Sequence, residues 1–230
     1  IDWQVSNLLT GESYCERVAA LTRRATDQIF AMAGSVTKRD KKTAAAIFES
    51  LLLTGIAMSF TKTSRPGSGT EHIMAHFWEC MELLDGKTPN YHGEDVGVTT
   101  LIMLQYYEKL ARLPQVTAHP EVCNWDEIYR IYGPLAPDVQ KLNTPDTITD
   151  GIDPCRIEAC WPQIRQIVQS VPSYDACLAA MRQAGCKTTI EEVGKDPDFV
   201  DISFRFHPYM RRRLSLKRVS HMLELPEPLF

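Results

Sequence analysis

The chain has 230 residues, of which 44% are hydrophobic, so it can form a sizeable core in one large domain or two small ones. The formal net charge of −4 gives no electrostatic reason to expect nucleic acid or a membrane as a partner. Uninterrupted apolar runs such as Leu51–Leu53 are too short to span a bilayer. Seven cysteines, an odd number without a C-x-x-C pair, favour a reduced, cytoplasmic protein.

Hydrophobic residues recur at helical spacing along the chain, and no run of alternating β-branched residues occurs. Capping residues mark several helix starts: Ser13, Asn124, Asp153, Ser173 and Ser215. The stretch over 44–60 is apolar on nearly every side, which predicts a buried helix. In chain order, helices are predicted for residues 2–9, 14–33, 44–60, 70–84, 94–113, a short segment after Asn124, 154–170, 173–184, 199–213 (interrupted at Pro208) and from Ser215 on. We therefore expect an all-α fold, a multi-helix bundle in which residues 1–230 form a single domain.

Most of the chemistry is concentrated in residues 64–76, which join the apolar helix to an amphipathic one. His72 and His76 are four residues apart and therefore share one helix face, a spacing that can hold a metal ion. The order is E-H-x-x-x-H, so the H-E-x-x-H protease motif is absent. His92, at the start of the next helix, can return to the same place if the two helices form a hairpin. A metal site and a purely structural role for the histidines both remain open.

The loop before this helix offers a second kind of site. Gly67 and Gly69 permit close backbone approach, and the helix start after them has free N–H groups for an anion. Arg65 can add a bidentate contact to a phosphate. An ordinary loop with a capping hydroxyl explains the same residues. A metal cation at this helix start would be opposed by the helix dipole unless carboxylates compensate.

Five motifs together resemble the sn-glycerol-1-phosphate dehydrogenase family. They are SRPGSGTEH at 64–72, WE at 78–79, HGEDVGVTT at 92–100 and, more weakly, LTGESYC at 9–15 and FHPYMR at 206–211. This family belongs to a larger group with glycerol dehydrogenases, iron-containing alcohol dehydrogenases and dehydroquinate synthases. The resemblance implies the fold of that group's helical C-terminal domain, and it spans nearly the whole chain.

The resemblance also implies a reaction and a site. The family reduces dihydroxyacetone phosphate to sn-glycerol 1-phosphate with NAD(P)H, a step in phospholipid metabolism, and holds a divalent metal, usually zinc, between one aspartate and two histidines. Matched by motif, the metal ligands are His72 and His92, His76 is a catalytic histidine, and Arg65 contacts the substrate. A small phosphorylated three-carbon substrate and a homo-oligomer are expected on the same basis.

The chain departs from the family pattern in one respect. No glycine-rich strand-turn-helix is found, so the NAD(P)-binding domain is expected to be absent from this chain, with no cofactor-binding residue here. The metal aspartate is expected in a segment before Ile1, and the chain alone is expected to be inactive. Without that aspartate, zinc should bind weakly, and less as pH falls through about 6.5, the ordinary pKa of histidine.

Two other functions remain open. One is a sugar-phosphate cyclase like dehydroquinate synthase, which shares the metal histidines but consumes no cofactor; the Ser64–Pro66 loop favours the dehydrogenase. The other is a non-catalytic helical module for oligomerisation or binding, in which the histidines are relics.

Overall fold

The computed structural model describes residues 1–225, and in that range it is helical with no β-strand, which confirms the all-α prediction. One isolated antiparallel bridge joins Ala118 to Leu223. The α-helices are α1 (Asp2–Thr10), α2 (Glu16–Val36), α3 (Lys41–Thr61), α4 (Thr70–Leu84), α5 (His92–Ala111), α6 (Trp125–Tyr132), α7 (Ala136–Asn143), α8 (Pro154–Gln169), α9 (Tyr174–Gln183), α10 (Pro197–Phe206) and α11 (Leu216–Val219). Short 3₁₀ turns lie at Arg65–Gly67, Gly133–Leu135, His207–Met210 and Ser220–Met222.

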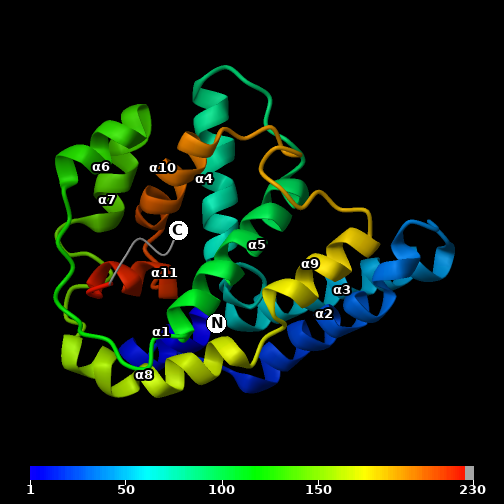
Figure 1. Ribbon diagram of the computed structural model, residues 1–230, viewed down its shortest axis with the longest axis horizontal. Helices are drawn as coiled ribbons and strands as arrows, with labels where there is room; N and C mark the ends of the chain where they lie inside the picture. Colours follow the sequence, from blue (N-terminus) through cyan, green and yellow to red (C-terminus); the bar gives the residue numbers. More distant parts are fainter. Residues whose placement is uncertain (226–230) are drawn as a thin grey trace.

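The helices pack mainly as neighbours in sequence (Figure 1). α2 and α3 form a hairpin that extends to one side, and α9 packs against α2 and α5. α4 and α5 pack together at the centre, and α1 and α8 lie across the base of the view. This order follows from short connections, which place consecutive helices side by side.

The main hydrophobic core lies along one face of α4. Met74, Phe77 and Trp78 have no exposed surface, and the Trp78 indole N–H donates to the Ser203 hydroxyl at 2.7 Å. Because residues three and four apart share a helix face, burying this stripe turns the side chains of His72 and His76 to the outside of α4. The core therefore decides which face of α4 presents the histidines.

Most of the predicted caps are confirmed. Asn124, Asp153, Ser173 and Ser215 each accept a backbone N–H at the start of a helix. The predicted Ser13 cap is wrong, because α2 begins at Glu16 with no side-chain cap bond. The carbonyl of Ser13 instead accepts the indole N–H of Trp3 at 2.8 Å, which holds this turn against α1.

The prediction that the helix over 44–60 is buried is wrong. α3 meets α2 through small residues such as Ala46, Ser50 and Ala57, and the Ser50 hydroxyl donates to the Ala25 carbonyl. Small contact residues let the two helix backbones approach closely, so the large side chains stay on the outer side. Five of them are 48–70% exposed: Phe48, Leu51, Leu52, Ile56 and Phe60. Within the described residues α3 is also long and apolar enough to cross a membrane, which as a single helix is weak support for a span.

Candidate metal centre

Three histidines from two helices meet on the outer face of α4. His72, His76 and Glu79 lie on α4, and His92 is the first residue of α5, returned to this face by the loop over 85–91. The ring centroids of His72 and His92 are 5.4 Å apart. The rings of His76 and His92 stack at 4.8 Å with an interplanar angle of 18°. The structure thus brings together all three histidines that the sequence singled out.

Each histidine has its Nδ1 hydrogen-bonded to a carboxylate. His72 Nδ1 is 2.7 Å from Glu71 Oε1, His76 Nδ1 is 2.8 Å from Glu79 Oε2, and His92 Nδ1 is 2.5 Å from Glu79 Oε1. Within residues 1–225 the Nε2 atoms of these histidines have no hydrogen-bond partner. The imidazoles are 25–45% exposed, so the Nε2 atoms are accessible from outside the chain.

The two carboxylates supply the negative charge that a cation needs at this helix start. Burial acts to raise the pKa of Glu79, but the hydrogen bonds from His92 and His76 outweigh it and hold the pKa below its ordinary value. In the same way, the bonds from His72 and the Gly69 N–H lower the pKa of Glu71 against the effect of burial. Both side chains are therefore ionised at pH 7. That zinc binds weakly without the upstream aspartate stays a prediction, and the chain itself provides two carboxylates beside the histidines.

The donor set fits a divalent metal of the zinc type. Imidazole nitrogen and carboxylate oxygen are ordinary zinc donors. His76, Glu79 and His92 each offer one donor atom within 4.8 Å of the others. His72 is next to this group through its contact with the ring of His92. Sequence reasoning assigned no role to Glu79, although its position three residues after His76 places it on the same helix face.

The start of α4 is already occupied by acidic side chains of the chain. Asp2, buried on α1, accepts the Thr70 N–H at 2.7 Å, and Glu71 Oε1 accepts the Gly69 N–H at 2.8 Å. Burial raises the pKa of Asp2, which also accepts hydrogen bonds from the Tyr107 hydroxyl and the Leu216 N–H. Two of the N–H groups predicted for an anion at this helix start, those of Gly69 and Thr70, are therefore used internally. The sequence did not reveal Asp2 as the partner of the Thr70 N–H, because the two residues are 68 positions apart in the chain.

All three guanidinium nitrogens of Arg65 donate hydrogen bonds within the chain. Its Nε and Nη2 donate to the two carboxylate oxygens of Glu12 at 2.8 and 2.5 Å, and its Nη1 donates to the Leu214 carbonyl at 2.8 Å. The Arg65 side chain is only 4% exposed. The charge of the guanidinium is already paired with Glu12. The role of Arg65 as a substrate contact stays a prediction, and the structure gives this residue a clear packing role.

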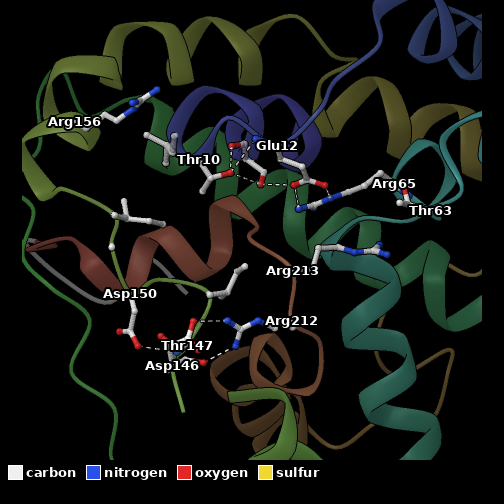
Figure 2. A pocket seen from close by; sticks show the side chains of 15 residues that line it. Thr10, Glu12, Thr63, Arg65, Asp146, Thr147, Asp150, Arg156, Arg212 and Arg213 are labelled. Atoms are coloured by element: carbon white, nitrogen blue, oxygen red, sulfur yellow. Dashed lines mark hydrogen bonds and ion pairs between the residues drawn. The ribbon is translucent and has the colours of Figure 1, made fainter. Parts of the chain in front are cut away.

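A polar cavity of about 720 Å³ lies beside this ion pair (Figure 2). Two of the arginines in its wall face carboxylates: Arg65 faces Glu12, and Arg212 faces Asp146 at 2.6 Å. Arg213 differs, because in the described part of the chain no carboxylate lies within ion-pair distance of it.

Arg213 is bonded to the loop that leads into α4. Its guanidinium donates to the Ser64 hydroxyl at 2.9 Å and to the Ser68 carbonyl at 3.1 Å. Burial and the neighbouring cations Arg65 and Arg211 lower the pKa of Arg213 from its ordinary value. A second cavity, of about 560 Å³, is lined by the same loop and by Glu71. An arginine without a counter-ion next to this loop is a candidate anion contact, which sequence reasoning missed.

The fold and the histidine cluster define a helical protein with a candidate centre for a divalent metal. Comparison with curated proteins confirms the resemblance to the glycerol-1-phosphate dehydrogenase family. No protein-family model matches the chain.

The relatives include bacterial and archaeal proteins that are named glycerol-1-phosphate dehydrogenase [NAD(P)+]. The protein of Geobacillus stearothermophilus is 26% identical over 229 residues, covering 100% of this chain and 50% of that protein. The Bacillus licheniformis protein is 33% identical over 141 residues, which is 61% of this chain and 34% of the relative. The Methanosarcina acetivorans protein is 34% identical over 104 residues, or 45% and 28%. The chain thus spans at most about half the length of the curated relatives it matches.

Proposed function

We propose that this chain is the metal-binding helical part of an oxidoreductase that reduces dihydroxyacetone phosphate to sn-glycerol 1-phosphate with NAD(P)H. The observation that carries the proposal is the meeting of His72, His76 and His92, each with Nδ1 tied to a carboxylate. The resemblance to the dehydrogenases along the whole chain supports the same reaction. The nicotinamide cofactor would bind to a part of the enzyme other than the helices described here.

In this proposal the Nε2 atoms of His72 and His92 hold the metal, which is zinc. The bound metal would act as a Lewis acid toward the substrate carbonyl as hydride arrives from the cofactor. His76 stacks on His92, keeps Nδ1 on Glu79 and has Nε2 directed away from that bond, so it is placed to exchange a proton with the substrate oxygen. These roles assign metal binding to His72 and His92 and catalysis to His76.

The phosphate of the substrate needs a cationic partner, and Arg213 fits this role better than Arg65. All three nitrogens of the Arg65 guanidinium already donate within the chain, and Glu12 already neutralises its charge. Among the described residues Arg213 bonds a hydroxyl and a carbonyl of the loop before α4, and no carboxylate forms a direct ion pair with it. An arginine fork of this kind matches phosphate geometry.

We also propose that the protein is cytoplasmic and assembles into a homo-oligomer. The support for assembly is the outer side of α3, where Phe48, Leu51 and Phe60 are 63%, 66% and 70% exposed. An apolar surface of this kind favours association. A nucleic-acid partner is not part of the proposal, because a net charge of −4 gives no electrostatic reason to expect binding to a polyanion.

The test uses the complete product of the gene, loaded with zinc. With dihydroxyacetone phosphate and NADH or NADPH, we expect oxidation of the cofactor, followed at 340 nm, and formation of sn-glycerol 1-phosphate. His72→Ala should abolish this activity, and His119→Ala, at a partly buried histidine outside the cluster, should leave it unchanged. Substrate turnover with release of phosphate and no net cofactor oxidation would instead support a cyclase. Lack of any turnover, with the protein folded, would support the non-catalytic module.

A further inference from the structure

We propose that Glu79 is a positioning residue that fixes His76 and His92 in the same tautomer, so that both present an unprotonated Nε2 toward the metal site. The inference rests on the proposed function only in that Nε2 of His92 is to bind the metal and Nε2 of His76 is to exchange a proton with the substrate. Glu79 itself does not touch the metal in this arrangement. It acts through the two histidines.

The geometry places one carboxylate between two imidazoles. Oε2 of Glu79 is 2.8 Å from His76 Nδ1, and Oε1 is 2.5 Å from His92 Nδ1. The Glu79 side chain is only 18% exposed, so water competes weakly for its oxygens. It is the group that connects the catalytic candidate on α4 to the metal-ligand candidate on α5.

An ionised carboxylate has only acceptors, and this dictates the tautomers. A neutral imidazole carries one N–H, and a hydrogen bond to a carboxylate places that proton on the bonded nitrogen. Because Nδ1 of both rings faces Glu79, both protons are at Nδ1 and both lone pairs are at Nε2. Nε2 is separated from Nδ1 by Cε1 in each ring, so with Nδ1 bonded to Glu79 each Nε2 points away from the carboxylate. Carboxylates in this position commonly orient metal-binding histidines and increase their basicity.

Glu71 does the same for His72 and provides a comparison. Its Oε1 is 2.7 Å from His72 Nδ1 and also accepts the Gly69 N–H at 2.8 Å. The three histidines are therefore held in one tautomer by two separate carboxylates. Removing one carboxylate should release only the histidines that it holds.

A different arrangement of the same residues has to be separated from this one. Because His76, Glu79 and His92 have donor atoms within 4.8 Å of one another, a metal could replace the bridging protons and bind Nδ1 together with the carboxylate. In that case Glu79 would be a ligand and Nε2 would remain free. The nitrogen that binds the metal therefore distinguishes a positioning role from a ligand role.

The experiment compares the wild type with Glu79→Gln, Glu71→Gln and the control Glu49→Gln, at an exposed residue of α3 that accepts a hydrogen bond from Gln28. Glutamine has one acceptor and one donor, so it cannot accept from two Nδ1–H groups at once. At pH 8 without metal, ¹⁵N NMR of the imidazoles should show three histidines of the cluster protonated at Nδ1 in the wild type. In Glu79→Gln, His76 or His92 should change to the Nε2–H tautomer while His72 stays as it was. In Glu71→Gln only His72 should lose its fixed tautomer.

The second measurement is titration with zinc. Glu79→Gln should lower zinc affinity about 10- to 100-fold, which is the usual effect of losing such a partner, and Glu49→Gln should match the wild type. On zinc binding, the Nε2 resonances of His72 and His92 should shift, with Nδ1 still protonated.

Unchanged tautomers in Glu79→Gln would overturn the inference, and so would zinc binding through Nδ1. A wild type with the expected tautomers that binds no zinc would remove the proposed metal function and leave the positioning role of Glu79 intact. The failure of one proposal is therefore distinguishable from the failure of the other.

Discussion

Replacing Arg65 by methionine tests whether this arginine stabilises the fold or serves the substrate. The change removes a guanidinium that is 4% exposed and that donates to both oxygens of Glu12 and to the Leu214 carbonyl. Breaking a buried ion pair by removing one partner costs about 3–5 kcal/mol. Since the stranded Glu12 is 30% exposed and can recover water, we expect Arg65→Met to cost about 3 kcal/mol, the lower end of that range.

The reverse change should cost more. Glu12→Gln strands the charge of Arg65, which is far less exposed than Glu12, so its cost should lie nearer the upper end of the range, about 5 kcal/mol. The double variant should cost less than the two single changes added together, because the pair is then removed as a unit. For a chain of this size, about 3 kcal/mol corresponds to a fall in Tm of roughly 10 °C.

Urea denaturation at pH 7 measures these differences, with the exposed Arg24→Gln as the control. A second arm varies the pH. Although burial opposes it, the bonds from Arg65 and Ser6 lower the pKa of Glu12 below 4.5. A lowered carboxyl pKa gives stability that is present above pH 4.5 and is lost as pH falls through the folded-state pKa. The difference in unfolding free energy between the wild type and Arg65→Met should therefore become smaller below pH 4.5. An Arg65→Met protein as stable as the wild type but unable to turn over substrate would refute this reasoning and restore the substrate role.

Three other predictions concern the metal, the assembly and the core. His92→Ala should lower zinc affinity about 10-fold or more, measured by calorimetry, whereas His119→Ala should not. Leu51→Glu should remove roughly 2 kcal/mol of apolar burial from an oligomer formed through α3, so light scattering should show dissociation at about 30-fold higher protein concentration. Lys217→Met should stabilise the protein at pH 6, by at most about 5 kcal/mol, because burial lowers the pKa of Lys217 from 10.5 to about 7. Below pH 7 the folded chain holds a charged, buried lysine at a cost in stability. The stabilisation by Lys217→Met, measured by thermal unfolding, should therefore be largest there and should disappear as the pH rises to 10.5.

The sequence alone was enough to predict the helices and the face of α4 that carries the chemistry. Helical periodicity is local, so the buried stripe with Phe77 and Trp78 implies that His72 and His76 lie together on another side. The motifs at 64–72 and 92–100 were enough to indicate the family, because they depend on residue identity and spacing in the chain.

Only the tertiary structure decided which partners these residues have. The bonds from Glu79 to His92, from Asp2 to Thr70 and from Arg65 to Glu12 join residues 13, 68 and 53 positions apart. Hydropathy likewise could not predict which side of α3 is buried, because an apolar composition does not say which side packs against another helix. Close packing of α2 on the small residues of α3 left Phe48 and its neighbours exposed. Local patterns set the helices and their faces, and the contacts between distant segments set the charges and hydrogen bonds of the site.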